Sequence, residues 1–184
     1  MSKKSQYDVG SNTIFKVSFD FGYLNLFKQW YVNKGSFKSN VIKSNWAGPK
    51  VLSTPNLVDS KFPFWNVYKP FLIQQVNEIY GVNVSIDLLW VNEYNRKSYI
   101  NLHNHPENHI VSVGYVKVDD KDSSSSLVVQ NNIDKSLVDI PVNCGDVLIF
   151  NGNVMHKTNP NMSLGKPRII IGANFTINYG KTLV

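Results

Sequence analysis

The stretch YINLHNHPENHIVSVGYVKV, residues 99–118, contains the pattern that decides the fold. Its side chains alternate with a period of two on both sides of a turn at Pro106 to Asn108, as expected for two β-strands and their connection. The same period continues upstream to residue 82 and downstream to residue 178, with turn residues about every eight to twelve positions. This region is therefore predicted to be β-structure.

Eight short strands are expected in this region, which fits a jelly roll, the cupin-like double-stranded β-helix. With helices expected upstream, the fold class is mainly β with N-terminal helices (α+β). The predicted strands cover residues 84–93, 98–105, 109–118, 126–130, 136–141, 146–151, 154–157 and 167–178.

Two helices are predicted before residue 82, packed outside one sheet of the barrel. A strand over residues 13–18 precedes the first helix, which Asp20 is placed to cap. The second helix is predicted over residues 67–80, with Pro70 in its first turn and Gly81 at its end.

The length of 184 residues and the hydrophobic content of 42% suit one domain with one core. We expect a single domain over residues 1–184, in which residues 1–81 support a double-stranded β-helix core over residues 82–178. The single cysteine, Cys144, excludes an intramolecular disulfide and a cysteine-cluster metal site.

The net charge of +6 is weak support for nucleic-acid binding, because only Arg96 and Arg168 are arginines and the other 17 of the 19 basic residues are lysines. We expect no nucleic-acid partner. Neither a membrane span nor a signal sequence is evident, so we expect a cytoplasmic protein, in the cytoplasm of the host cell if the chain is viral.

The histidines indicate a metal site. The chain has four, and His103, His105 and His109 fall within seven residues. Side chains at i and i+2 of a strand leave the same face, so His103 and His105 are expected side by side. His156 would be the third ligand, because the turn at residues 151–153 should send the chain back across the sheet. His109 is placed either as a further ligand or simply at the start of a strand.

The last predicted strand has two different faces. One is uniformly apolar and should bury against the helices. The other carries Arg168, Gly172, Asn174 and Thr176, which suits the lining of a cavity. A buried arginine needs an anionic partner, either a bound carboxylate in a bidentate pair or one of the acidic side chains of the chain.

Together these motifs resemble the iron(II)- and 2-oxoglutarate-dependent oxygenases, and above all a branch common in phage and bacterial genomes. The resemblance extends over about residues 40–178. The matching text is NLHNHP at 101–106, VGYVKV at 113–118, GDVLIF at 145–150 followed by His156, and RIIIGANF at 168–175, with SNWAG at 44–48 and LWVN at 89–92 upstream.

The resemblance implies that His103, His105 and His156 hold a catalytic iron(II) that 2-oxoglutarate chelates. Arg168 would pair with the far carboxylate of 2-oxoglutarate, Tyr115 would hydrogen-bond it, and Asn174 would touch the near carboxylate. Such an enzyme uses O2, hydroxylates a C–H bond and releases succinate and CO2, with ascorbate as a reductant. Its prime substrate would be peptidyl, and therefore a protein, or a small molecule.

The chain departs from the superfamily at two positions. The usual ligand set has a carboxylate two residues after the first histidine, where this chain has His105. Either His105 takes that place, which we prefer, or His105 and Glu107 form the pair and His103 lies outside the metal ligands. Ile170 also stands where many relatives carry serine.

Two other functions remain open at this point. A cupin-type metalloenzyme that does not use 2-oxoglutarate would have the same histidine pattern, although cupins often add a glutamate ligand where this chain has His109. A non-catalytic metal-binding jelly roll, as a binding or virion-associated protein, is the other alternative.

Overall fold

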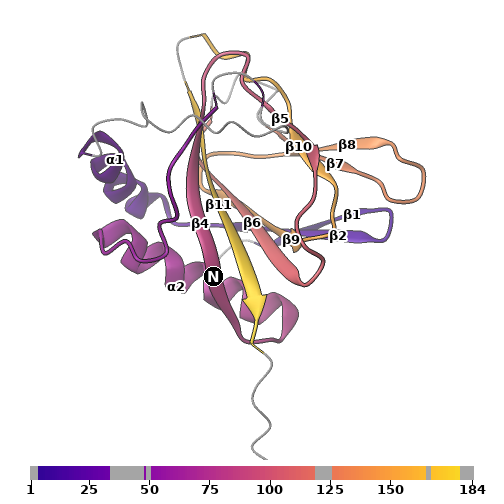
Figure 1. The fold of residues 1–184 in the computed structure, drawn as a ribbon, viewed down its shortest axis with the longest axis horizontal. Coiled ribbons are helices and arrows are strands. Elements are labelled where there is room, and N and C mark those ends of the chain that lie inside the picture. The colour runs from indigo at the N-terminus through magenta and orange to yellow at the C-terminus, as the bar shows by residue number, and fades with distance from the viewer. Residues whose placement is uncertain (1–3, 34–47, 49–50, 119–125, 165–166, 179–184) are drawn as a thin grey trace, which may run out of the picture.

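The computed structural model describes residues 4–33, 48, 51–118, 126–164 and 167–178. Two antiparallel sheets face each other within this part of the chain (Figure 1), as in a double-stranded β-helix, so the predicted fold is confirmed. The larger sheet has the strand order β1-β2-β9-β6-β11-β4-β3, and the smaller has the order β5-β10-β7-β8.

The larger sheet contains seven strands. They are β1 (Ser5–Val9), β2 (Asn12–Ser18), β3 (Val51–Ser53), β4 (Val84–Tyr94), β6 (His109–Lys117), β9 (Asp146–Asn151) and β11 (Arg168–Ile177). The smaller sheet contains β5 (Ile100–His103), β7 (Ser126–Gln130), β8 (Leu137–Pro141) and β10 (His156–Thr158). Strands β4 to β11 are the eight predicted ones, and β2 matches the strand predicted over residues 13–18.

Four details of the strand prediction are wrong. Strands β1 and β3 were not predicted, and β3 has only three residues, too few to show a period. Strand β5 ends at His103, so His105 lies beyond it. The turn at residues 151–153 does not send the chain back across one sheet, because β9 belongs to the larger sheet and β10 to the smaller.

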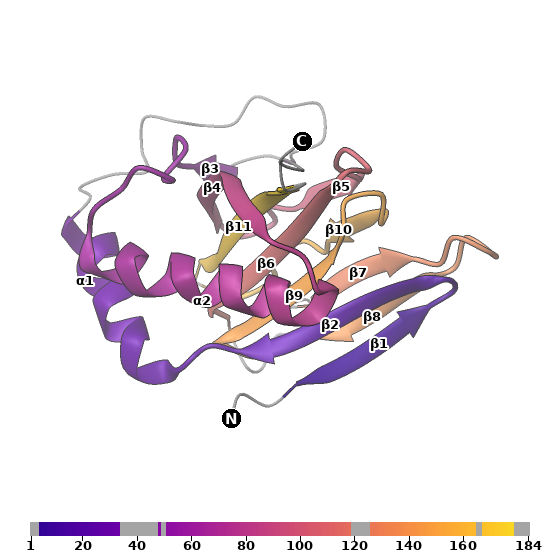
Figure 2. The same cartoon turned by 90° about the horizontal axis from the view of Figure 1, so that it is seen from below.

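Two helices cover one face of the larger sheet (Figure 2), as predicted. Helix α1 (Leu24–Asn33) follows a 3-10 turn η1 (Phe21–Tyr23), and the Asp20 carboxylate accepts a hydrogen bond from the Gly22 N–H. Helix α2 (Pro63–Tyr80) ends at Gly81 as predicted but begins earlier. Pro63 stands at its N-terminus, where no N–H is required, and Pro70 lies inside the helix rather than in its first turn.

The larger sheet separates two apolar clusters. On its helix side, Trp30, Trp65 and Leu72 pack against Ile171 and Phe175 of β11. On its other side, between the two sheets, a second cluster includes Ile170 and Phe150. The candidate site lies on this second side. No helix within the described ranges has both the length and the apolar character that a membrane crossing requires.

Candidate metal and co-substrate site

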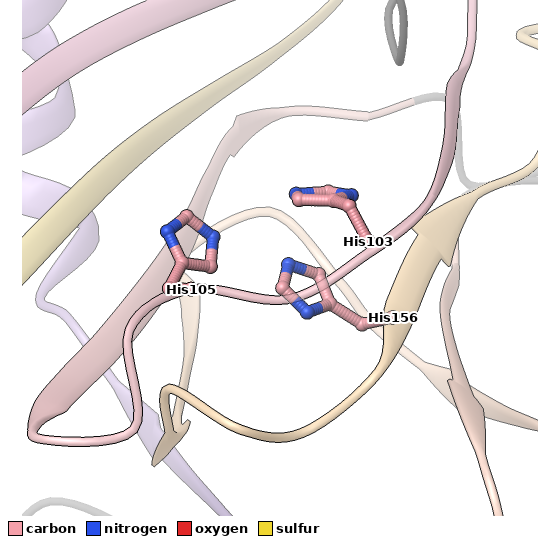
Figure 3. Close-up of side chains that lie close together, drawn as sticks. All are labelled: His103, His105 and His156. Carbon is pink, nitrogen blue, oxygen red and sulfur yellow. The ribbon is translucent and has the colours of Figure 1, made fainter.

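Three imidazoles converge between the sheets (Figure 3). His103 ends β5, His156 begins β10, and the two residues are partners in the strand pairing. His105 approaches from the turn after β5. One ligand nitrogen from each of the three lies within 4.8 Å of the others, and their ring centroids are 4.3 to 5.4 Å apart. Such a cluster is of the right size to surround one metal ion.

Backbone carbonyl groups orient two of these rings. The Nδ1 of His103 is 2.8 Å from the carbonyl oxygen of Asn101, and the Nδ1 of His156 is 2.9 Å from that of Val154. A carbonyl only accepts, so the Nδ1 that faces it carries the proton, and the Nε2 of His156 then keeps its lone pair. This arrangement is typical of metal-binding histidines, because the hydrogen bond fixes both the tautomer and the ring orientation.

Burial keeps the three rings neutral. Loss of solvation, together with the neighbouring histidines, lowers the pKa of His156 to about 3 and that of His105 to about 4. Burial also lowers the pKa of His103. At neutral pH all three are therefore unprotonated, the form that a metal ion requires.

A close backbone contact at Gly152 positions His105. The His105 N–H donates to the Gly152 carbonyl, and the Gly152 N–H donates to the His109 carbonyl, both at 2.8 Å. A Cβ atom at residue 152 would lie only 2.2 Å from the Pro106 carbonyl oxygen. Only glycine allows the β9–β10 turn to approach the His105–His109 turn this closely. His105 is thus held by turn contacts rather than by a strand.

The sequence left two ligand sets open, and the residues of one of them, His103, His105 and His156, lie together in the structure. Glu107 is exposed, and it does not belong to the only cluster of potential metal ligands found in the described part of the chain. His109 is also outside that cluster, and its Nε2 lies 4.0 Å from Asp87 Oδ2. The arrangement therefore favours His103, His105 and His156.

Arg168 and Tyr115 lie at the closed end of the space between the sheets. Arg168 is 2% exposed, its Nη2 donates to the Asn159 carbonyl at 2.7 Å, and its Cζ lies 4.7 Å from the Tyr94 ring centroid. The Tyr115 hydroxyl is buried and has no hydrogen-bond partner among the described residues. Burial raises the pKa of Tyr115, so this hydroxyl stays protonated and can donate. A carboxylate would satisfy both groups.

A pocket connects the histidines with this closed end. Its lining includes the three histidines together with Trp90, Asn92 and Tyr94 of β4. Arg168 and Tyr115 are outside the lining, but each is paired across strands with a lining residue, Tyr94 and Ile170 respectively. Asn174 is 5% exposed and lies two positions along β11 from the lining residue Gly172.

The contribution of β4 was missed by the sequence analysis. Trp90, Asn92 and Tyr94 occupy alternate positions and line the pocket, whereas Leu89 and Val91 between them are buried on the helix side. The period of two along residues 88–94 could have predicted that these three side chains share one face of the sheet. The Trp90 ring lies against Gly172, where an added Cβ would be 2.4 Å from the indole, and is 6.4 Å from the His105 ring.

Comparison with known families and structures confirms the resemblance drawn from the motifs. Residues 88–174 match the family described as "Putative 2OG-Fe(II) oxygenase". This range contains the three clustered histidines, Tyr115, Arg168 and Asn174. The upstream motif at residues 44–48 lies outside the match, and residues 44–47 are outside the described part of the structure. No curated protein sequence matches the chain significantly.

Several solved structures share the fold. HygX from Streptomyces hygroscopicus, with nickel, 2-oxoglutarate and hygromycin B bound, has a TM-score of 0.71 at 13% identity, over 90% of this chain and 83% of HygX. A Pseudomonas putida prolyl-4-hydroxylase has a TM-score of 0.68 at 11% identity, over 91% of this chain and 94% of the hydroxylase. SnoN is a non-heme alpha ketoglutarate dependent epimerase from nogalamycin biosynthesis. It has a TM-score of 0.72 at 14% identity, over 89% of this chain and 77% of SnoN. At these identities the likeness concerns the fold.

Proposed function

We propose, from the match of residues 88–174 to the 2OG-Fe(II) oxygenases, that this chain is an iron(II)- and 2-oxoglutarate-dependent dioxygenase. The observation that carries the proposal is the convergence of His103, His105 and His156 within 4.8 Å, each neutral. These three residues would hold the iron through imidazole nitrogen. Bound together, iron(II) and 2-oxoglutarate supply the chemistry that uses O2 to oxidise a substrate while releasing succinate and CO2.

The protein itself contributes a preorganised set of donors. The carbonyl groups of Asn101 and Val154 orient two of the imidazoles, so little reorganisation of these rings accompanies metal binding. Three neutral ligands add no negative charge to the site, unlike a set with one carboxylate. The bound iron would keep its full positive charge, which favours a dianionic co-substrate.

Arg168 and Tyr115 would bind the far carboxylate of 2-oxoglutarate. Both are buried at the closed end of the site, and the Tyr115 hydroxyl, which has no partner in the described part of the chain, is a donor that a carboxylate would satisfy. The Asn174 amide nitrogen would donate to the near carboxylate. Apolar side chains such as Ile170 and Val113 on the same face exclude water from the reacting groups.

The reaction we propose is hydroxylation of a C–H bond, with ascorbate as an auxiliary reductant. Similar folds accommodate different substrates and outcomes: one was solved with hygromycin B, another with a peptide fragment of hypoxia inducible factor, and SnoN is an epimerase. The prime substrate is accordingly a peptidyl group or a small molecule.

Succinate formation tests the proposal. The purified chain is incubated with iron(II), 2-oxoglutarate and ascorbate in air, and succinate is measured with and without iron. Wild type should form succinate in an iron-dependent reaction. The Arg168→Ala variant should lose more than about 90% of this activity at low 2-oxoglutarate, because a buried charge-assisted contact is removed. Arg96→Ala, at the exposed arginine, is the matched control and should retain it.

Two outcomes would favour the alternatives. Metal-dependent turnover that survives Arg168→Ala would support a cupin-type enzyme that does not use 2-oxoglutarate. A thermal melt stabilised by metal but unchanged by 2-oxoglutarate would support a non-catalytic metal-binding protein.

A further inference from the structure

The site face of the larger sheet changes character along β4 and β11. At one end Tyr94 and Arg168, which pair with each other, are at most 2% exposed. At the other end Leu88 is 45% exposed and the Asp87 side chain 39% exposed. The site is therefore closed at the arginine and open at Asp87, so a substrate larger than 2-oxoglutarate would approach from the Asp87 end.

A β-bulge turns Asp87 toward this open end. Asn174 of β11 pairs with Leu88, and the next residue, Phe175, pairs with Ile86, which leaves Asp87 without a partner on β11. Regular alternation would place Asp87 on the same face as Leu89, which is buried in the core under the helices. The bulge instead brings its carboxylate to the site face, a known use of bulges beside functional sites.

Side-chain hydrogen bonds stabilise the bulge on both faces of the sheet. The Asn56 side chain satisfies the backbone on both sides of it, because its amide nitrogen donates to the Asp87 carbonyl and its oxygen accepts from the Leu89 N–H, both at 3.0 Å. On the site face, the Thr176 hydroxyl donates to Asp87 Oδ2, and His109 Nε2 lies 4.0 Å from the same oxygen. Thr176 and His109 are partners in the pairing of β11 with β6.

Hydrogen-bond acceptors gather around this carboxylate. With its proton on Nε2, facing Asp87, His109 presents Nδ1 as an acceptor, and this buried atom has no partner within the described ranges. The buried Oδ1 of Asn174 also has none in that part of the chain. Asn174 pairs with Val111, two positions from His109 on the same face of β6. A ligand that satisfies these atoms must offer several hydrogen-bond donors, and beside the Asp87 carboxylate a cationic ammonium group, with its N–H donors, suits them best.

We propose that Asp87, His109 and Asn174 form an outer subsite that binds a protonated aliphatic amine of the prime substrate. The inference rests on the proposed function, because it takes the three clustered histidines as the reacting centre. Leu88 and the Trp90 ring border the same end of the site and suit the aliphatic chain that carries the cation. The substrate class is thus an aliphatic amine, either a basic side chain of a peptide or a free polyamine.

Calorimetry on the full chain loaded with iron(II) and 2-oxoglutarate without oxygen tests this subsite. The probes are N-acetyl-lysine N-methylamide, its neutral analogue N-acetyl-norleucine N-methylamide, and spermidine. We expect the lysine probe to bind at least about fivefold more tightly than the norleucine probe. Asp87→Asn should weaken the lysine probe about fivefold and leave the norleucine probe unchanged. Tighter binding of spermidine than of the lysine probe would indicate a free polyamine.

The control variant is Glu78→Gln, which removes an exposed negative charge from α2 and should not change binding of any probe. If Asp87→Asn fails to fold, as judged by a thermal melt, His109→Gln tests the same subsite and should also weaken the lysine probe. Equal binding of the lysine and norleucine probes, or no binding of any amine, overturns the inference. Failure of wild type to bind iron(II) or 2-oxoglutarate in the loading step overturns the proposed function instead.

Discussion

The helix-covered face of β11 consists of apolar side chains that are buried from Ile169 to Phe175, whereas the opposite face borders the candidate site. Ile171 and Phe175 on the first face pack against both helices. Arg168, Gly172 and Asn174 on the second face are equally inaccessible to solvent but polar or small. One strand therefore provides core packing on one side and, in the proposed function, ligand contacts on the other. Substitutions on the first face should change folding stability, and those on the second should change ligand binding.

The largest effect is expected on the helix-covered face. Phe175→Ala should lower the free energy of unfolding by about 3–5 kcal/mol, because it opens a cavity in the apolar core. Asn174→Ala, one residue away on the site face, should cost about 1 kcal/mol or less, since its amide oxygen has no partner to lose among the residues that the structure describes. Urea unfolding measures both. Equal losses of unfolding free energy in the two variants would show that the two faces of β11 contribute equally to folding stability.

Metal binding should give the next largest effect, on the site face. A metal at a hundredfold excess over its dissociation constant should stabilise wild type by about 2.7 kcal/mol. His156→Gln should abolish this stabilisation, because it removes one of three ligands. His109→Gln should retain it, since His109 lies outside the cluster. Thermal melts with and without iron(II), in the absence of oxygen, provide the comparison. Loss of the metal response in His109→Gln would contradict the assigned ligand set.

A smaller effect should appear when the pH of the metal-free protein is lowered. His156 and His105 have pKa values of about 3 and 4 in the folded chain, against about 6.5 when unfolded. Below pH 6.5 the unfolded chain takes up protons that the folded chain does not, so stability falls from pH 6.5 toward pH 4. We expect a loss of about 1–2 kcal/mol between pH 7 and pH 6, with about 0.7 kcal/mol from each of the two histidines. Urea unfolding at several pH values checks the slope, which His156→Gln should reduce.

The smallest effect is expected at Tyr115. Tyr115→Phe removes a hydroxyl that has no partner within the described residues, so the free energy of unfolding should change by less than about 0.5 kcal/mol. The affinity for 2-oxoglutarate should fall about fivefold, the equivalent of one hydrogen bond. Calorimetric titration of 2-oxoglutarate into the metal-loaded variant measures this change. An unaltered affinity would remove Tyr115 from the co-substrate site.

Much of the fold was predictable because its signals are local. The alternation along β11 gave its apolar and polar faces correctly, and the spacing of His103 and His105 indicated the histidine cluster before any geometry was known. The start of α2 was misplaced because Pro63 and Pro70 both fit a helix N-terminus. Packing of Phe64 and Trp65 in the core decides between them, and this contact is not visible in the local sequence.

The parts of the site that were missed depend on pairing between distant segments. Asp87 reaches the site face only because β4 and β11 pair with a bulge, and no residue type marks the bulge in the sequence. The same limit applies to His105, which was expected in a strand. Its place is fixed by Gly152, which is far from it in the chain.

The contact at Gly152 has a kinetic consequence. It joins the turn that leaves the larger sheet to the turn that carries His105, and His156 follows at the start of a strand of the smaller sheet. The three imidazoles can therefore meet only after both sheets have formed and docked. We expect metal to bind after the folding transition state, so that it slows unfolding and leaves the folding rate unchanged. Stopped-flow measurements with and without metal would test this, and a metal-dependent folding rate would show that the site forms early.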